Sequence, residues 1–246
     1  MVGAVEFQDV TYRLHSRSLV SRLNFTIQQG ETLVLLGRSG CGKTTTLRLI
    51  NRLLTPTVGA VLVEGVSTRE WNPIHLRRRT GYVIQEIGLF PHFTVARNIG
   101  VVPALEKWPP PKIQARVFDL MTLVGLEPGR FADRYPHQLS GGQRQRVGVA
   151  RALAADPPLL LMDEPFGALD PITRVQIQRE FRDLQQRLGK TVVFVTHDIQ
   201  EAFRLGSRIG LMQAGELVVL ATPIEFARST HPEARAFLSV REEDGL

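Results

Sequence analysis

The chain has 246 residues, 43% of them hydrophobic, so it can bury a sizeable core, and this composition excludes disorder as the default interpretation. Its single cysteine, Cys41, excludes an intramolecular disulfide and metal sites built from clustered cysteines. The net charge of +6 is compatible with nucleic acid, anionic lipid headgroups, a polyanionic ligand such as a nucleotide, or simply arginine-rich solvated helix faces.

No apolar run reaches the roughly 18 residues that a membrane-spanning helix needs. The N-terminus already alternates like a strand, and it lacks the basic region, apolar region and cleavage site of a secretory signal. We therefore expect a chain that does not cross a membrane and stays in the cytoplasm.

The first segments of the chain alternate apolar with polar residues. This pattern covers residues 5–12, 24–27 and 61–63. It is typical of an antiparallel sheet with one covered face. We predict an antiparallel β part on the N-terminal side.

Four short apolar runs do not alternate. They cover residues 34–36, 82–84, 159–162 and 192–195, and each is followed by turn-forming or polar residues and then by a helical pattern. Unbroken apolar strands that alternate with helices indicate a parallel sheet covered on both faces. The core should therefore be α/β.

The first apolar run leads into a phosphate-binding loop. Residues 37–44 fit the pattern G-x-x-x-x-G-K-[S/T], and an amphipathic helix through Leu47, Ile50 and Leu54 should follow. Glycines let the N–H groups of such a loop point inward, and the helix presents its positive N-terminal end to phosphates. The pattern therefore predicts a nucleotide site.

Two residues of this loop have separate expected roles. Lys43 should reach the β and γ phosphates, and the hydroxyl of Thr44 should coordinate Mg²⁺. Cys41 is interpreted as a small residue that the loop tolerates, since no histidine lies near it in sequence to form a catalytic pair.

The strand pattern disappears between residues 88 and 155. Apolar residues recur at helical spacing from Ile113 to Val124, which predicts an inserted helical lobe. The prolines at 109–111 are interpreted as a stiff loop before this helix and not as a recognition motif.

The third apolar run ends in two adjacent carboxylates, Asp163 and Glu164. Ligands of open α/β sheets bind at the carboxyl ends of the strands. Asp163 is the better candidate for holding Mg²⁺, directly or through water, and Glu164 for polarising the attacking water. The alternative, a strand with a merely polar end, is disfavoured by the phosphate-binding loop upstream.

The last strand signal is a hairpin. Residues 208–212 and 217–220 flank a short turn that contains Gly215.

Together these patterns predict one domain over residues 1–246. Its expected parts are a core at 1–87 and 156–225 that includes the antiparallel β part, a helical lobe at 88–155 and a helical tail at 226–246.

The segment after the helical lobe carries a family resemblance. It reads Leu139-Ser140-Gly141-Gly142-Gln143, and it resembles the signature that distinguishes ABC ATPases from other P-loop proteins. A serine and two glycines before a helix form an anion-accepting N-terminus. Three further segments resemble this family, in its order: Gln85 its Q-loop, Ala168-Leu169-Asp170 its D-loop, and His197 its switch histidine.

This resemblance implies a fold and an assembly. The fold is an α/β P-loop NTPase with a RecA-like parallel sheet core, an N-terminal antiparallel β subdomain and an inserted α-helical subdomain. The cofactors are ATP and Mg²⁺. The assembly is an ATP-dependent head-to-tail homodimer, in which Ser140 and Gly142 act on the γ phosphate bound by the other copy and His197 contacts the γ phosphate.

The resemblance also assigns site residues. Those assigned to catalysis are Lys43, Gln85, Glu164 and His197. Those assigned to the nucleotide are Gly37, Arg38, Ser39, Gly40, Cys41, Gly42, Lys43, Thr44, Thr45, Tyr12, Ser140, Gly141, Gly142, Gln143 and Asp170. Those assigned to the metal ion are Thr44, Gln85 and Asp163.

One position departs from the family pattern. Leu14 stands where the family usually places an aromatic residue that stacks on adenine. Tyr12, two residues earlier, should share its strand face. Two arrangements stay open: Tyr12 stacks on the base, or Leu14 packs under it.

Three further segments narrow the resemblance to one group of ABC ATPases. Residues 88–92, 98–103 and 163–174 resemble ATPase subunits of importers for osmoprotectants such as glycine betaine, choline, carnitine or proline. This implies a place at the cytoplasmic face of the cell membrane, with integral membrane permease subunits and, indirectly, a substrate-binding protein as partners. Many members add a C-terminal pair of regulatory domains; ionic-strength sensing through such domains is not expected of this chain.

Other roles are weighed against this one. The stretch between Lys43 and Ser140 has no sustained heptads, unlike the coiled coil of DNA-repair ABC ATPases. Translation-factor types carry two cassettes and fused exporters carry membrane helices, neither of which the sequence predicts. Import of another small solute, such as an amino acid, stays open. A nucleic-acid-linked ATPase also stays open, although no nucleic-acid partner is expected.

Overall fold

The structure, a computed structural model, describes residues 3–85, 88–167 and 169–243, with only the backbone for 240–243. The chain divides into two units. The first unit is Met1–Arg77 with Lys190–Leu246, and the second unit is Arg78–Gly189. In the described ranges, no helix has both the length and the apolar character needed to cross a bilayer.

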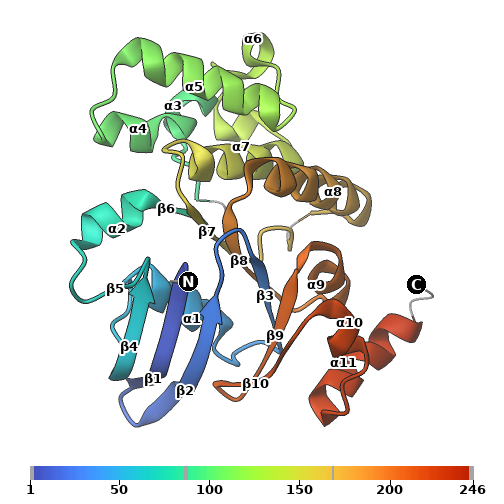
Figure 1. Cartoon of the computed structure of the whole chain (residues 1–246). Coiled ribbons are helices and arrows are strands. Elements are labelled where there is room, and N and C mark those ends of the chain that lie inside the picture. Colours follow the sequence, from blue (N-terminus) through green and yellow to red (C-terminus); the bar gives the residue numbers. More distant parts are fainter. Residues whose placement is uncertain (1–2, 86–87, 168, 244–246) are drawn as a thin grey trace. The chain divides into compact units, whose positions relative to one another are not determined.

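The first unit begins with an antiparallel sheet. Its strands are β1 (Val5–Leu14), β2 (Arg17–Ile27), β4 (Val58–Val63) and β5 (Val66–Ser67), in the order β2-β1-β4-β5 (Figure 1). Val5 and Phe7 are buried, and Phe7 stacks on Phe25 with ring centroids 4.5 Å apart. This confirms the antiparallel sheet predicted from the alternating pattern.

Buried parallel strands form the other sheet of the first unit. β3 (Thr32–Leu36) lies between β8 (Thr191–Thr196) and β9 (Arg208–Gln213), parallel to both, and β10 (Glu216–Ala221) pairs antiparallel with β9. Every residue of β3 and β8 is buried. The predicted apolar strands at 34–36 and 192–195 and the predicted hairpin are confirmed.

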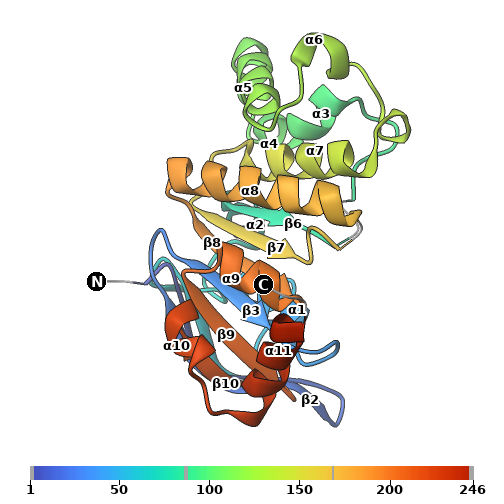
Figure 2. The same ribbon diagram turned by 90° about the vertical axis from the view of Figure 1, so that its right-hand side faces the viewer.

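Helices cover these strands within the first unit. α1 (Lys43–Ile50) contacts β8 and the antiparallel sheet, and α9 (Ile199–Leu205) contacts β3 and β8. Figure 2 shows α10 (Pro223–Ala227) beside β9 and β10, and α11 (Pro232–Glu243) packs on α9. The C-terminal helices therefore belong to the unit that carries the phosphate loop.

The second unit pairs two parallel strands with helices. β6 (Thr80–Val83) pairs with β7 (Leu159–Asp163), and α2 (Pro73–Arg79), which precedes β6, contains the boundary between the first unit and the second. The other elements are α3 (Val95–Ile99), α4 (Val101–Leu105), α5 (Pro110–Leu123), α6 (Pro128–Phe131), the 3₁₀ helix η1 (Pro136–Gln138), α7 (Gly141–Leu153) and α8 (Pro171–Leu188). Figure 2 shows α7 and α8 side by side. This unit is larger than the helical lobe expected at 88–155, and the division into core, lobe and tail remains a prediction.

Two local expectations were wrong. The helix after the phosphate loop ends at Ile50, and the chain turns at Arg52, whose φ is 48°, so Leu54 lies outside the helix. The proline run is not a loop, because Pro110 and Pro111 are the first residues of α5. Proline is tolerated there since the first helical N–H groups have no intrahelical partner.

The buried position of β3 yields a stability prediction. Leu35→Ala should lower the free energy of unfolding by about 2–5 kcal/mol, because a fully buried leucine leaves a cavity when truncated. Ile224→Ala, at a side chain that is 69% exposed, should change it by less than about 0.5 kcal/mol. Urea unfolding followed by circular dichroism would measure both, and equal effects would contradict the central role of β3.

Candidate nucleotide-binding site

The phosphate-binding loop joins β3 to α1 through three glycines with positive φ, two of which leave no room for a Cβ atom. Gly37, Gly40 and Gly42 have φ values of 155°, 77° and 109°. A Cβ atom at Gly37 would collide with the carbonyl oxygen of Met212, and one at Gly42 would lie 2.7 Å from the carbonyl oxygen of Leu19. The loop backbone is thus pressed against β2 and β9, and only glycine fits at these two points.

Lys43 is folded into this loop. Its side chain is buried, and its Nζ donates to the carbonyl oxygens of Gly37 at 2.7 Å and Arg38 at 2.9 Å. The Sγ atom of Cys41 lies 3.9 Å from Nζ. Burial raises the pKa of the Cys41 thiol, which disfavours a reactive thiolate. The ammonium group therefore lies at the loop backbone, within reach of any anion that the loop accepts.

The start of α1 suits an anion. Gly42 is its N-cap and provides no side-chain acceptor to the first N–H groups, while Thr44 and Thr45 are half-buried in the first turn. The Oγ1 atom of Thr46 donates back to the carbonyl oxygen of Gly42 at 3.0 Å. A glycine-rich loop and a helix N-terminus without a side-chain cap leave backbone N–H groups available to bind a polyphosphate.

His197 follows β8 in a turn fixed on both sides. Thr196 donates from Oγ1 to the Oε2 atom of buried Glu201 at 2.6 Å, and the N–H of Asp198 donates to Thr196 Oγ1 at 2.9 Å. The side chain of Asp198 caps α9 by accepting from the N–H of Gln200 at 2.7 Å. Glu201 therefore stabilises the histidine turn, a role that sequence reasoning missed.

Tyr12 and Leu14, the two candidates for the adenine contact, both lie on β1. Tyr12 is half-buried, whereas Leu14 is 50% exposed. Both arrangements of the base remain predictions.

In the second unit, β7 delivers the two carboxylates. Asp163 is buried as the last residue of the strand, and Glu164 follows with φ of 44°. This left-handed conformation is uncommon outside glycine, and here it turns the chain directly after β7. The Nε2 atom of Gln85 donates to Glu164 Oε2 at 3.3 Å, so the structure brings together two residues that lie 79 positions apart.

The signature segment begins α7 with a reciprocal cap. The N–H of Gln143 donates to Ser140 Oγ at 3.3 Å, and the N–H of Ser140 donates to Gln143 Oε1 at 3.0 Å. A Cβ atom at Gly142 would lie 2.8 Å from Thr173 Cγ2 in α8. The pattern S-x-x-Q could have revealed this structural role of Gln143 from the sequence. Its contact with a nucleotide stays a prediction.

Asp170 caps the next helix. Its Oδ1 atom accepts from the N–H of Thr173 at 3.0 Å at the start of α8, and this hydrogen bond holds the pKa of Asp170 below its usual range. Ala168, in the predicted D-loop, lies outside the described residues.

The predicted site residues fall into two groups. Tyr12, His197 and the phosphate loop lie in the first unit, and Gln85, Asp163, Glu164, the signature and Asp170 in the second.

Comparison with known proteins decides the family. A family model for ABC transporters matches residues 20–167. The chain belongs to the ABC transporter family. The glycine betaine/carnitine/choline transport ATP-binding protein OpuCA of Bacillus subtilis (strain 168) is 54% identical over 87% of this chain and 56% of its own length. The glycine betaine uptake system ATP-binding protein YehX of Escherichia coli (strain K12) is 52% identical over 89% of this chain and 71% of its own.

A solved structure matches the fold of this ABC family chain. The dimeric ATP-binding cassette MJ0796, in a post-hydrolysis state bound to ADP and Pi, is 35% identical with a TM-score of 0.78, over 89% of this chain and 98% of its own. This similarity confirms the P-loop NTPase fold class. The chain spans a little over half the length of OpuCA and related curated transport proteins.

The glycines of this ABC phosphate loop form a matched pair for mutation. Gly37→Ala should abolish measurable ATP binding or unfold the loop, because the new Cβ collides with backbone. Gly40→Ala should reduce affinity far less, since no described atom lies within 4 Å of a Cβ atom built there, and only its φ of 77° is strained. Isothermal titration calorimetry with ATP and thermal unfolding would compare them. Equal effects would refute the crowding at Gly37.

Proposed function

We propose that this chain is the ATP-hydrolysing nucleotide-binding subunit of an ABC importer, and that the importer takes up osmoprotectants such as glycine betaine, choline, carnitine or proline. The phosphate loop carries the proposal: a glycine cradle without room for Cβ atoms at Gly37 or Gly42, with the Lys43 ammonium at its carbonyls. The substrates named for OpuCA and YehX support the solute class.

The loop is proposed to hold the polyphosphate of ATP. Lys43 exchanges its hydrogen bonds to the carbonyl oxygens of Gly37 and Arg38 for phosphate oxygens, and the first N–H groups of α1 donate to the same anion. Charge-assisted hydrogen bonds are stronger than those to neutral carbonyls, so the exchange favours the bound nucleotide.

The donor set suits Mg²⁺ as a partner of the nucleotide. Among the described residues, no cluster of three or more His, Cys, Asp or Glu side chains could hold a metal ion by itself. Mg²⁺ usually binds through one or two protein ligands, phosphate oxygens and water, and when bound it neutralises charge on the phosphates. Thr44, Asp163 and Gln85 are the residues proposed to contact it.

Glu164 is proposed as the general base. Its carboxylate accepts a hydrogen bond from Gln85, and its left-handed backbone turns the chain directly after the buried strand that ends at Asp163. A base in this position takes a proton from the attacking water while His197 contacts the γ phosphate.

The signature segment is proposed to complete the site in a second copy of the chain. Ser140 and Gly142 would meet the γ phosphate bound by the other copy, which requires an ATP-dependent head-to-tail dimer; MJ0796 is described as dimeric. The further partners proposed are integral membrane permease subunits and, indirectly, a substrate-binding protein, at the cytoplasmic face of the membrane.

The transport role is tested with the permease that co-purifies with the chain. Reconstituted in vesicles, the assembly should take up glycine betaine in an ATP-dependent way. Uptake of an amino acid but not of quaternary amines would favour the alternative solute class. ATP hydrolysis stimulated by DNA or RNA, with an affinity that falls steeply as salt rises, would favour a nucleic-acid-linked ATPase.

Lys43→Ala should weaken ATP binding by about 10- to 100-fold and lower hydrolysis as well, because the ammonium compensates phosphate charge in ground and transition states. Lys112→Ala, which removes an ammonium that lies 4.1 Å from the centroid of the Trp108 ring, is the control and should bind ATP normally. Calorimetry measures both, and wild-type affinity in Lys43→Ala would exclude the proposed role.

Glu164→Gln should lower hydrolysis by about 10²–10⁴-fold, because the amide keeps the size of the side chain but cannot take a proton. ATP should still bind, so the variant should be dimeric with ATP and Mg²⁺ and monomeric with ADP in size-exclusion chromatography with light scattering. Hydrolysis at the wild-type rate would remove Glu164 from catalysis. ATP binding without dimerisation would contradict the shared site.

A further inference from the structure

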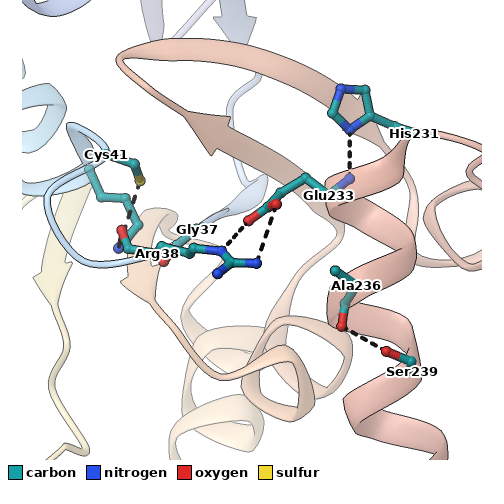
Figure 3. A network of polar contacts seen from close by, with 8 residues as sticks. Gly37, Arg38, Cys41, His231, Glu233, Ala236 and Ser239 are labelled. Atoms are coloured by element: carbon teal, nitrogen blue, oxygen red, sulfur yellow. Dashed lines mark hydrogen bonds and ion pairs between the residues drawn. The ribbon is translucent and has the colours of Figure 1, made fainter.

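An ion pair joins the phosphate loop to the C-terminal helix α11 (Figure 3). Arg38 donates from Nε to Glu233 Oε1 at 2.6 Å and from Nη2 to Glu233 Oε2 at 3.5 Å. The side chain of Glu233 is 13% exposed, whereas that of Arg38 is 72% exposed. The carboxylate is therefore the confined member of the pair, and the guanidinium is the one that can move into solvent.

Glu233 is held in place independently of Arg38. Ala234 and Leu238, one helical turn apart, are buried and anchor α11, which packs on α9. The N–H of Glu233 donates to His231 Nδ1 at 3.3 Å at the start of the helix (Figure 3). Since α11 keeps its own anchor, the carboxylate stays beside the loop whether or not Arg38 is bound to it.

The backbone of Arg38 contacts Lys43, the lysine proposed to bind phosphate. Its backbone carbonyl oxygen accepts from Lys43 Nζ at 2.9 Å, next to the bond from Nζ to the Gly37 carbonyl oxygen. Glu233 thus restrains the side chain of Arg38. The backbone carbonyl oxygen of Arg38 accepts a hydrogen bond from the Lys43 ammonium. Each of the two cations of the loop, Arg38 and Lys43, therefore already has a partner within the chain.

We propose that the Arg38–Glu233 pair is an autoinhibitory contact, through which Glu233 competes with nucleotide phosphate for Arg38 and lowers the affinity of the loop for ATP. The inference rests on the proposed function. The carboxylate neutralises one positive charge beside an anion-binding loop, and it restrains the backbone whose carbonyl holds Lys43. Removing it leaves Arg38 free to contact the phosphates.

The size of the effect follows from the exposure of the pair. Ion pairs with an exposed member are weak, so Glu233→Gln should tighten the dissociation constant of ATP by about two- to fivefold. The gain should shrink as salt rises, since the charges are screened. Arg38→Met breaks the pair from the other side and should weaken ATP binding, because the guanidinium that would contact the phosphates is lost.

The experiment compares full-length variants in calorimetric titrations with ATP, in EDTA to prevent hydrolysis, at low and high salt. The set is wild type, Glu233→Gln, Arg38→Met, the double variant and Glu106→Gln. The last is the matched control. It removes a carboxylate from another surface ion pair, with Arg78 at 3.1 Å in the second unit, and should bind ATP as the wild type does. Thermal unfolding checks that each variant is folded.

The expected pattern is tighter ATP binding in Glu233→Gln and no effect of Glu233→Gln once Arg38 is already Met. The inference would be overturned if Glu233→Gln bound ATP with the same affinity as Glu106→Gln, or more weakly than the wild type. Equal tightening with and without Arg38 would overturn it as well, because the effect would not pass through the pair. A wild-type chain that binds no ATP would overturn the proposed function too, so the two failures are distinguishable.

Discussion

The nucleotide site depends on one steric constraint, the lack of room around the loop between β3 and α1. Gly37 meets the backbone of β9 at Met212, and Gly42 meets the backbone beside Leu19 in β2. β3 is buried at every position, so the loop starts from a strand that is fixed in the core. The loop leads directly into the N-terminus of α1, which has no side-chain cap, and helix N-termini of this kind favour anions.

The two cationic side chains of this loop are both compensated by groups of the same chain. Lys43 is satisfied by two backbone carbonyl oxygens, and Arg38 by a carboxylate from a helix near the other end of the chain. The buried Lys43 ammonium needs such partners, because an unpaired charge away from water is costly, whereas the Arg38 guanidinium is largely exposed. If the loop binds a polyphosphate as proposed, Lys43 exchanges its carbonyl partners for phosphate oxygens, and the affinity is the difference between the two sets of interactions.

In the second unit, backbone conformation positions the residues proposed for catalysis. β7 is apolar and fully buried until Asp163, and the left-handed φ of Glu164 then turns the chain at once. Gln85 approaches Glu164 from the end of β6. In the signature, reciprocal capping between Ser140 and Gln143 keeps the first turn of α7 rigid, so residues proposed for ATP contact also stabilise the helix that presents them.

The sequence by itself determined the features that depend on neighbouring residues. These are the strands at 34–36 and 192–195, the hairpin around Gly215, the glycine loop before Lys43 and the two carboxylates where β7 ends, because periodicity and glycine conformation are local properties. Only the tertiary structure decided the end of α1 before Leu54, the Gln85–Glu164 contact and the Arg38–Glu233 pair. The partners in these pairs are 79 and 195 positions apart, so their meeting depends on how whole elements pack, which no local pattern contains.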